Sequence, residues 1–289
     1  MTTPDALITT YERWQKAGRP TQIPSPWKLK SWTNQLGHYK EFFNRLNGDP
    51  IDRKQAVQLS PIVTNEEEAV QVFLLAMLWG HGLVGYGPFR TSRILDRPEA
   101  AAELLEVAQV AQRDGGLAAF KLVVDRRNGE SRSFLKWLGP AFGTKYIYFL
   151  TAKNNPQEPA PVMDAVVYRW FRKHAPDRKL RVDFWHTPSY EQFLNSLEEW
   201  ASDIAQRFGQ EIRIDDVEYL IFAEGSRFEG NDWSELWEAE QRAASASLLF
   251  DQLRALASSH QNHQFSFELI DKLEAHLLKS DASEQPPQC

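Results

Sequence analysis

Apolar residues recur at every third or fourth position along most of the chain, which is the spacing of an amphipathic helix. In the first half, this spacing predicts helices over residues 4–17, 33–46, 64–79, 98–112 and 116–124. In the second half, it predicts helices over residues 131–137, 165–174, 189–208, 215–224, 233–257 and 266–279. Residues 179–184 alternate in the manner of a strand, but over only a few positions. The pattern therefore predicts an all-α protein.

Capping residues and glycines mark where some of these helices begin and end. Thr64 is followed three residues later by Glu67, and this spacing predicts a capping box at the start of an apolar helix. Gly80 then ends that helix and opens a glycine-rich aromatic loop that runs to Phe89. Residues 280–289 are polar and contain proline, so we expect a disordered tail there.

The chain contains no segment with the features of a signal peptide and no apolar run long enough to cross a bilayer. Its best candidate, residues 70–79, is too short for a membrane span. Cys289 is the sole cysteine, so no disulfide framework can form. These features favour a cytoplasmic protein without a membrane partner.

Charge is distributed unevenly along the chain, whose formal net charge is −6. Residues 121–181 contain 13 lysines and arginines against 5 aspartates and glutamates, a local balance of +8. A basic stretch within an acidic chain predicts a surface that faces phosphates, although an exposed helix face is often basic without such a role. Arg132 and Lys136 lie in this stretch and are candidate contacts to a nucleic acid.

A short glycine-rich segment, residues 139–143, separates the expected helix over 131–137 from a following apolar helix. Two helices joined in this way form a tight hairpin, and glycine leaves the backbone amides open to a ligand. Amides at the start of the second helix would then bind an anion such as a DNA phosphate. An ordinary turn between helices has the same pattern.

Lys145 comes shortly after this hairpin, in what we expect to be the first turn of the second helix. The positive end of the helix dipole and burial in a cleft both disfavour a charged ammonium there. A neutral amine at this position could attack a sugar carbon and form a Schiff base. The alternative is a solvated lysine without a catalytic role.

Asp164 precedes the expected helix over 165–174 and has the position of a helix N-cap, where an ionised carboxylate is favoured. Helix starts thus have opposite effects on the two residues, since they disfavour the charge of Lys145 and favour that of Asp164. Cleavage of a glycosidic bond through a Schiff base needs such a pair, an amine to attack C1′ and an anion to stabilise the cationic transition state. Simple helix capping is the alternative role for Asp164.

The segment Gly143-Thr144-Lys145, followed by Pro161-Val162 and then by Asp164 nineteen residues after the lysine, resembles the signature of helix-hairpin-helix DNA glycosylases. It is most similar to the 8-oxoguanine DNA glycosylase branch in bacteria, which includes enzymes that act on phage DNA. The resemblance implies a two-lobed helical fold, a Schiff-base nucleophile at Lys145 and a catalytic carboxylate at Asp164. It also implies a glycosylase core over 61–279 with its hairpin at 131–152, preceded by a helical extension over 1–60.

Three departures from the family pattern are visible. Ala141 replaces the first glycine of the hairpin, and Val166 replaces a histidine that commonly binds phosphate in this branch. The cysteine cluster that holds an iron–sulfur centre in another branch is absent, because Cys289 is alone. We therefore expect no metal and no cofactor.

The loop from Trp79 to Arg90 is a candidate for inserting into DNA. An enzyme that acts on a base must first take it out of the stack, and a side chain must fill the gap. Leu83, Tyr86 and Phe89 have the size and character for this, because stacking against a base contributes about 1–3 kcal/mol. The alternative is a packed loop whose aromatic side chains are buried.

The base itself would lie among aromatic side chains. The alternative, which helical spacing more often indicates, is that these side chains form core. The candidates for the pocket are Trp79, His81, Phe149, Trp233 and Trp237. For His81, a hydrogen bond to a backbone carbonyl is the favoured alternative role. The candidates for contact with DNA are Gly139, Ala141, Gly143, Thr144, Arg132, Lys136, Tyr86, Phe89 and Arg90.

The sequence thus predicts a monomeric DNA glycosylase that acts on double-stranded DNA containing a modified base, with strand cleavage by β-elimination as an expected second activity. Phage defence against a bulky modified cytosine, such as glucosylated hydroxymethylcytosine, is the favoured role. Repair of 8-oxoguanine is an alternative. A helix-hairpin-helix module that binds DNA without cutting it, and a helical protein–protein adaptor, are the rivals outside enzymes.

Overall fold

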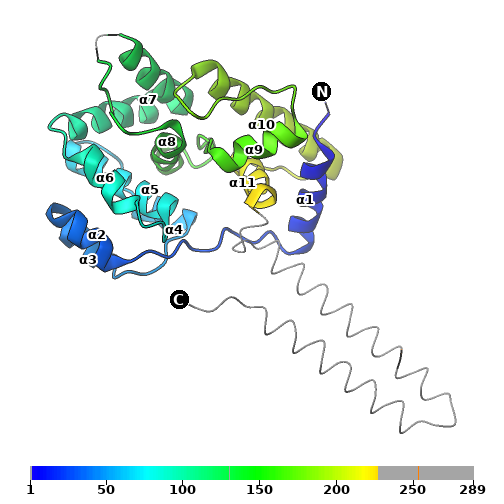
Figure 1. Ribbon diagram of the computed structural model, residues 1–289. Helices are drawn as coiled ribbons and strands as arrows, with labels where there is room; N and C mark the ends of the chain where they lie inside the picture. Colours follow the sequence, from blue (N-terminus) through cyan, green and yellow to red (C-terminus); the bar gives the residue numbers. More distant parts are fainter. Residues whose placement is uncertain (1, 130, 227–252, 254–289) are drawn as a thin grey trace, which may run out of the picture. The chain divides into compact units, whose positions relative to one another are not determined.

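The computed structural model describes residues 2–129, 131–226 and 253, and these form α-helices with no β-strand among them (Figure 1). The expected all-α class is therefore confirmed. The helices are α1 (Asp5–Lys16), α2 (Leu29–Gln35), α3 (Lys40–Arg45), α4 (Arg53–Leu59), α5 (Glu66–His81), α6 (Gly87–Leu95), α7 (Ala100–Asn128), α8 (Pro140–Asn154), α9 (Ala165–His174), α10 (Thr187–Phe208) and α11 (Ile214–Ser226). A 3₁₀ turn, η1 (Gly37–Tyr39), lies between α2 and α3.

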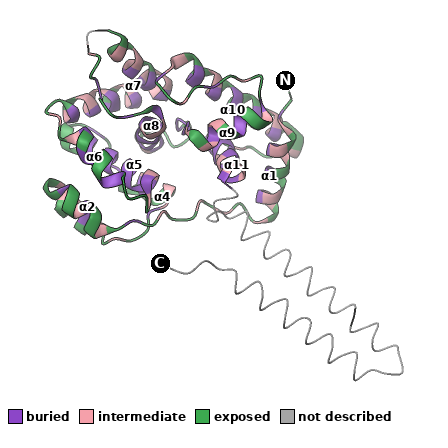
Figure 2. Cartoon of the chain, viewed as in Figure 1, coloured by how far each residue is buried: buried purple, intermediate pink, exposed green. Residues whose placement is uncertain are grey.

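Helix α8 is the centre of this arrangement. Every residue from 143 to 152 is buried, so the helix is covered on all sides rather than along one face (Figure 2). Helices α5 and α7 pack against it and against each other. In Figure 1, α2–α6 lie on one side of α8, and α1, α9 and α11 lie on the other.

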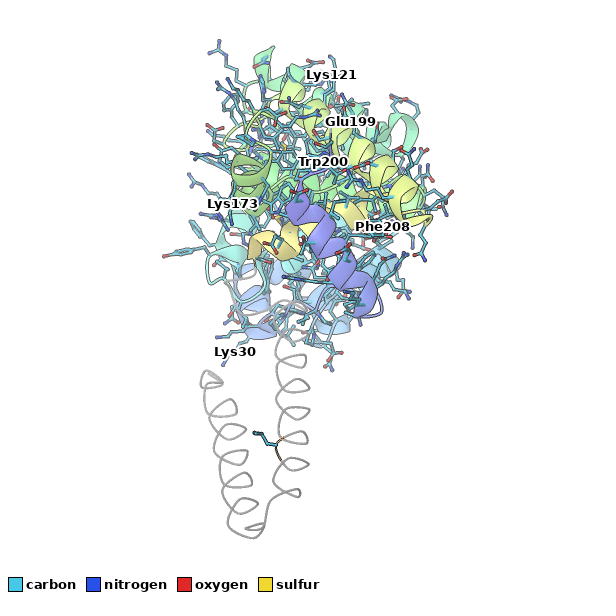
Figure 3. The ribbon with its side chains drawn as sticks, turned by 90° about the vertical axis from the view of Figure 1, so that its right-hand side faces the viewer. Lys30, Lys121, Lys173, Glu199, Trp200 and Phe208 are labelled. Carbon is cyan, nitrogen blue, oxygen red and sulfur yellow. The ribbon has the colours of Figure 1, made fainter. Side chains whose placement is uncertain are left out.

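The first sixty residues pack onto the rest of the described chain. Tyr11 of α1 contacts Phe208 of α10 with ring centroids 4.8 Å apart, and Figure 3 shows α1 beside the labelled Trp200 and Phe208. Helix α4 packs against α8 and α5, and α2 packs against α6. The expected domain boundary at residue 60 stays a prediction.

Several expected helix ends were wrong. The helix expected over 33–46 is two helices separated by the 3₁₀ turn, and those expected over 98–112 and 116–124 are continuous as α7 with a kink at Gly115. The capping box predicted at Thr64 is not formed. Asn65 caps α5 instead and accepts from the Glu68 amide at 3.0 Å, while Thr64 donates to the Glu68 carboxylate. Helices α4 and α6 were not expected, and residues 179–184 form no strand.

The helix expected over 131–137 was also wrong, because this segment is a series of turns. Leu135 and Trp137 have φ angles of 44° and 76°, which a right-handed helix does not allow. The half-buried Arg127 guanidinium holds this shape by donating to the carbonyls of Phe134, Leu135 and Leu138. Burial lowers the pKa of Arg127 to about 10. We refer to residues 131–139 as the turn segment.

The helices expected over 233–257 and 266–279, and the tail over 280–289, fall outside the described residues apart from residue 253. Within the described part of the chain, no helix combines the length and the apolar character that a membrane span requires.

Candidate active site

Lys145 projects from α8 into the interior, where its side chain is only 8% exposed. Its Nζ donates a hydrogen bond of 2.8 Å to Oδ2 of Asp164. The lysine stem lies against Gly80 of α5, where an added Cβ would stand 2.6 Å from Lys145 Cδ. Gly80 therefore provides the space for the lysine to cross α5. The structure thus joins the two residues expected to carry the chemistry.

Asp164 caps α9 as expected. Its Oδ1 accepts from the amides of Val166 and Val167 at 3.0 and 3.2 Å, which leaves Oδ2 for Lys145. Burial alone would raise the pKa of Asp164, but the Lys145 ammonium and the two amides outweigh it and hold this pKa below its ordinary value. Asp164 is therefore anionic in the resting protein.

The position expected for Lys145 along its helix was wrong. Helix α8 begins at Pro140 with Gly139 as its N-cap, so Lys145 lies in the second turn. The dipole effect falls off within the first turn of a helix, so it contributes less here than expected. Asp164 is instead the dominant electrostatic neighbour of the ammonium.

The hairpin glycines also differ from expectation. Gly143 lies inside α8 and its amide donates to the Gly139 carbonyl at 2.9 Å, so it is not open to a phosphate. A Cβ at Gly143 would stand 2.2 Å from the indole of Trp185, which shows that close packing requires this glycine. The amides that remain without an acceptor in the helix are those of Ala141 and Phe142, and both residues are partly exposed.

Thr144 connects the two halves of the site rather than facing solvent. Its side chain is fully buried, and its hydroxyl accepts from the Met163 amide at 3.1 Å. Met163 immediately precedes Asp164, and Thr144 immediately precedes Lys145. The bond therefore holds the backbone before Asp164 against α8 beside Lys145. A DNA contact by the Thr144 side chain, as the sequence suggested, is not compatible with this burial.

A cavity of about 720 Å³ opens beside the lysine and the aspartate. Its walls come from the connector after α1, from α4, from the end of α5 and from α11. The lining residues are Gln22, Ile23, Pro24, Ser25, Pro26, Arg53, Trp79, Gly80, His81, Gly82, Leu83, Val84, Lys145, Val162, Asp164, Glu218, Phe222 and Ser226. We refer to it as the lysine cavity.

Of the aromatic residues expected in a base pocket, two line the lysine cavity. Trp79 lies with its ring centroid 5.5 Å from Lys145 Nζ, and its buried Nε1 has no hydrogen-bond partner among the described residues. His81 stacks on Phe142 with centroids 3.9 Å apart. Phe149 is buried behind Trp79 and does not line the cavity. Trp233 and Trp237 lie outside the described residues.

His81 is neutral in this setting. Burial is the larger cause that lowers its pKa to about 4, and the positive charges of Arg90 and Lys145 lower it further. Its stacking on Phe142 differs from the carbonyl hydrogen bond that the sequence favoured. A neutral, flat ring therefore forms part of the cavity wall.

A second buried ion pair, which was not expected from the sequence, lies in the lysine cavity. Arg53 of α4 donates to Glu218 Oε2 of α11 at 2.7 Å, with Glu218 only 1% exposed. The Arg53 guanidinium also lies 5.2 Å from the ring centroid of Trp79 and 4.9 Å from that of Tyr148. Burial raises the pKa of Glu218 to about 7, although Arg53 opposes this. No local pattern marks either residue, because they are far apart in sequence and meet only after folding.

Exposed aromatic side chains gather outside the lysine cavity. Tyr86 is 70% exposed and Phe89 is 55% exposed, near the start of α6, and Arg90 is also exposed. One turn later, the Arg93 guanidinium lies 3.5 Å from the ring centroid of Trp137, which is half exposed on the turn segment. This contact joins α6 to the turn segment, which also presents Arg132 and Lys136 to solvent.

An all-helical chain that buries a lysine against a helix-capping carboxylate, in an open cavity, has the architecture of a helical DNA glycosylase. The family model described as "Putative 8-oxoguanine DNA glycosylase OGG-like protein" matches residues 18–222, and the chain belongs to this family. Membership suggests DNA glycosylase activity and hence binding to DNA. No curated protein matches the chain, and no solved structure does. Among residues 2–129 and 131–226, no group of three or more potential ligand side chains is arranged to hold a metal ion.

Proposed function

We propose that the protein is a DNA glycosylase in which Lys145 is the nucleophile and Asp164 is the essential carboxylate. The hydrogen bond of 2.8 Å between the two side chains, at the wall of the lysine cavity, carries this proposal. A helix-hairpin-helix module that only binds DNA, or a protein–protein adaptor, has no need for a buried lysine that faces an open cavity. Burying such a charge is costly, and apolar residues would stabilise a core equally well or better.

In the proposed reaction, Lys145 gives up one proton to solvent so that Nζ carries a lone pair, which attacks C1′ of the flipped nucleotide. The C1′–N bond breaks, its electron pair leaves with the base, and the base takes up a proton. Asp164 stabilises the positive charge that develops at C1′. In the covalent product, the Nζ lone pair then forms a C1′=N double bond as the bond between C1′ and the ring oxygen breaks, and the ring oxygen keeps the electron pair and takes up a proton. The result is a Schiff base, from which β-elimination can cleave the strand.

The surface that would hold the duplex is formed by α6 and the turn segment. Tyr86 and Phe89 are exposed enough to fill the gap left by a flipped base. Arg90, Arg93, Arg132 and Lys136 form no ion pair within the described residues, so their charges are available to phosphates, although Arg93 and Lys136 also lie over the Trp137 ring. The amides of Ala141 and Phe142, at the start of α8, supply a further anion site close to Lys145.

For the substrate, we propose a bulky modified cytosine such as glucosylated hydroxymethylcytosine, and hence a role in defence against phage DNA. The lysine cavity has a volume within the range of about 300–1,000 Å³ that accommodates drug-sized ligands, so it offers more room than a single base requires. Arg53 donates to Oε2 of Glu218, and in the ionised form of Glu218 the other carboxylate oxygen is suited to accept from the amino group of cytosine. The family description names 8-oxoguanine, which is the alternative substrate.

Two measurements test the proposal. Borohydride added during reaction with substrate DNA should trap a covalent complex in the wild type, which Lys145→Ala should not form. Lys153→Ala, on the same helix, is the matched control and should trap normally. Equal trapping by Lys145→Ala would assign the nucleophile to another residue.

The second measurement identifies the base. The protein is incubated with phage DNA carrying glucosylated hydroxymethylcytosine and with an 8-oxoguanine duplex, and released bases are measured by mass spectrometry. Release from the phage DNA supports the proposed substrate. Release from the 8-oxoguanine duplex alone would establish the alternative.

A further inference from the structure

A second cavity, of about 440 Å³, adjoins the lysine cavity. Gln22 and Arg53 line both cavities and therefore form the partition between them. The other walls come from α1, from the segment after it, from α4, from the end of α8 and from the start of α11. We refer to it as the annex.

The walls of the annex are rich in charged groups of both signs. Four cations, Arg19, Arg53, Lys54 and Arg213, face three carboxylates, Asp52, Asp215 and Asp216. Arg53 is paired with Glu218, and Arg213 donates to both oxygens of Asp215. Such a balanced lining does not favour a phosphate or another ion, but it offers many donors and acceptors to a neutral polar group.

Aromatic and aliphatic surfaces complete the annex. Trp14, Tyr148 and Tyr219 line it beside Val57 and Ala152. Flat aromatic faces together with paired charged groups suit a ligand that has both apolar C–H faces and several hydroxyl groups. That combination is the chemistry of a sugar.

Two buried polar atoms at the partition lack a hydrogen-bond partner among the described residues. They are Oε1 of Gln22 and Nε of Arg53, an acceptor and a donor. Buried polar atoms are almost always satisfied in folded proteins, so each exception requires an explanation. A bound group with hydroxyls, which both donate and accept, would satisfy both atoms.

We infer that the annex is a binding site for a neutral, polyhydroxylated substituent carried by the flipped base. The base ring occupies the lysine cavity, and its substituent extends past Gln22 and Arg53 into the annex. This inference rests on the proposed glycosylase function. It also gives a role to the first sixty residues, which supply Trp14, Gln22 and Arg53.

Binding measurements test the annex separately from catalysis. The full-length chain with Lys145→Gln, which cannot form a Schiff base, is titrated with two duplexes that differ at one base. One carries 5-hydroxymethylcytosine and the other its glucosylated form. We expect the glucosylated duplex to bind at least about tenfold more tightly, a difference of about 1.4 kcal/mol.

Neighbouring positions on α4 provide a matched pair of variants. Gln58 lines the annex and is exposed, so Gln58→Trp should fill it without disturbing the core. Leu59 is 52% exposed and lines neither cavity, so Leu59→Trp is the control. Added to the Lys145→Gln background, Gln58→Trp should bring the affinity ratio of the two duplexes close to one, whereas Leu59→Trp should leave it unchanged.

Equal affinities of the Lys145→Gln protein for the two duplexes would overturn the inference that the annex binds the substituent. An affinity ratio that Gln58→Trp does not reduce would overturn it as well. Neither result would affect the glycosylase proposal, which depends on base release and trapping by the wild type. Conversely, absence of base release from every DNA would overturn the glycosylase proposal, while the affinity ratio would still decide whether the annex binds a sugar.

Discussion

Nζ of Lys145 and Oδ2 of Asp164 lie 2.8 Å apart and connect the second turn of α8 to the residue that caps α9. Both side chains are almost fully buried, with exposed fractions of 8% and 13%. Because desolvation of two charges offsets much of their attraction, a buried ion pair is weak evidence for stability. The pair is better explained by the chemistry that it can perform.

The Asp164→Asn variant separates capping from catalysis. Asparagine keeps an oxygen for the amides of Val166 and Val167, so α9 should remain capped. The anion that stabilises C1′ is lost, and single-turnover base release should fall by at least about 10²–10³-fold, as when one electrostatic group is removed from other enzymes. Base release close to that of the wild type would leave Asp164 with a capping role alone.

The Asp164→Asn variant should also be less stable than the wild type. Asp164→Asn leaves the Lys145 charge without its partner, which costs about 3–5 kcal/mol in buried pairs. Replacing both residues, in the double variant Lys145→Gln with Asp164→Asn, removes both charges and should restore most of the free energy of unfolding. Chemical denaturation of the single and double variants measures this, and additive losses would contradict it.

Charge reversal on the turn segment tests the proposed DNA surface. Arg132→Glu and Lys136→Glu should weaken binding to any duplex, and each should reduce the slope of log affinity against log salt concentration by about one. Lys121→Glu is the control from the same basic stretch, because Lys121 already pairs with Asp125. A salt-insensitive affinity in the wild type would favour the adaptor over an enzyme that binds DNA.

The lowered pKa of His81 predicts that the folded protein loses stability in mild acid. Its pKa is lowered to about 4 in the folded protein from an ordinary value of 6.5, so only the unfolded chain takes up this proton between those values. The stabilisation is therefore complete above pH 6.5 and is lost as the pH falls towards 4, by at most about 3 kcal/mol. His81→Phe, which can still stack on Phe142, should show a smaller fall in the free energy of unfolding over this range. An identical pH profile in the variant would exclude His81 as the cause.

Alanine substitutions at two glycines near the start of α8 should differ in their cost to the stability of the folded protein. Gly143→Ala places a Cβ about 2.2 Å from the Trp185 indole and should cost about 1–3 kcal/mol of stability, as overpacking does. Gly139→Ala meets no atom within 4 Å and has a φ angle of −80°, so it should cost only the loss of a favourable N-cap residue, about 1 kcal/mol or less. Thermal denaturation of both variants checks the difference. Equal stability would show that the segment adjusts without cost.

Local signals were sufficient for α9 but not for every helix, since α4 was not expected although Asp52 and Gln55 form a capping box at its start. The expected helix over 165–174 agrees with α9, because Asp164 provides an N-cap that can be recognised from the sequence. The turn segment could not be predicted in the same way. Its local pattern is compatible with a helix, but Arg127 and Glu103, which lie outside the segment, bind its carbonyls and one amide.

The residues of the candidate site also differ in whether they could be found from the sequence. Lys145 and Asp164 could be found from the sequence because each stands beside a motif, and the structure places them in contact. Arg53 and Glu218 have no such motif, and they become partners only because α4 and α11 both reach the cavity. Likewise, the need for Gly143 comes from Trp185, more than forty residues away, rather than from a phosphate. The sequence by itself determined the all-α class and marked Lys145 and Asp164 as candidates, because helical periodicity and capping act within a few residues. The shape of the cavity and the partners of its buried charges were decided only by tertiary packing, because these depend on which distant helices meet.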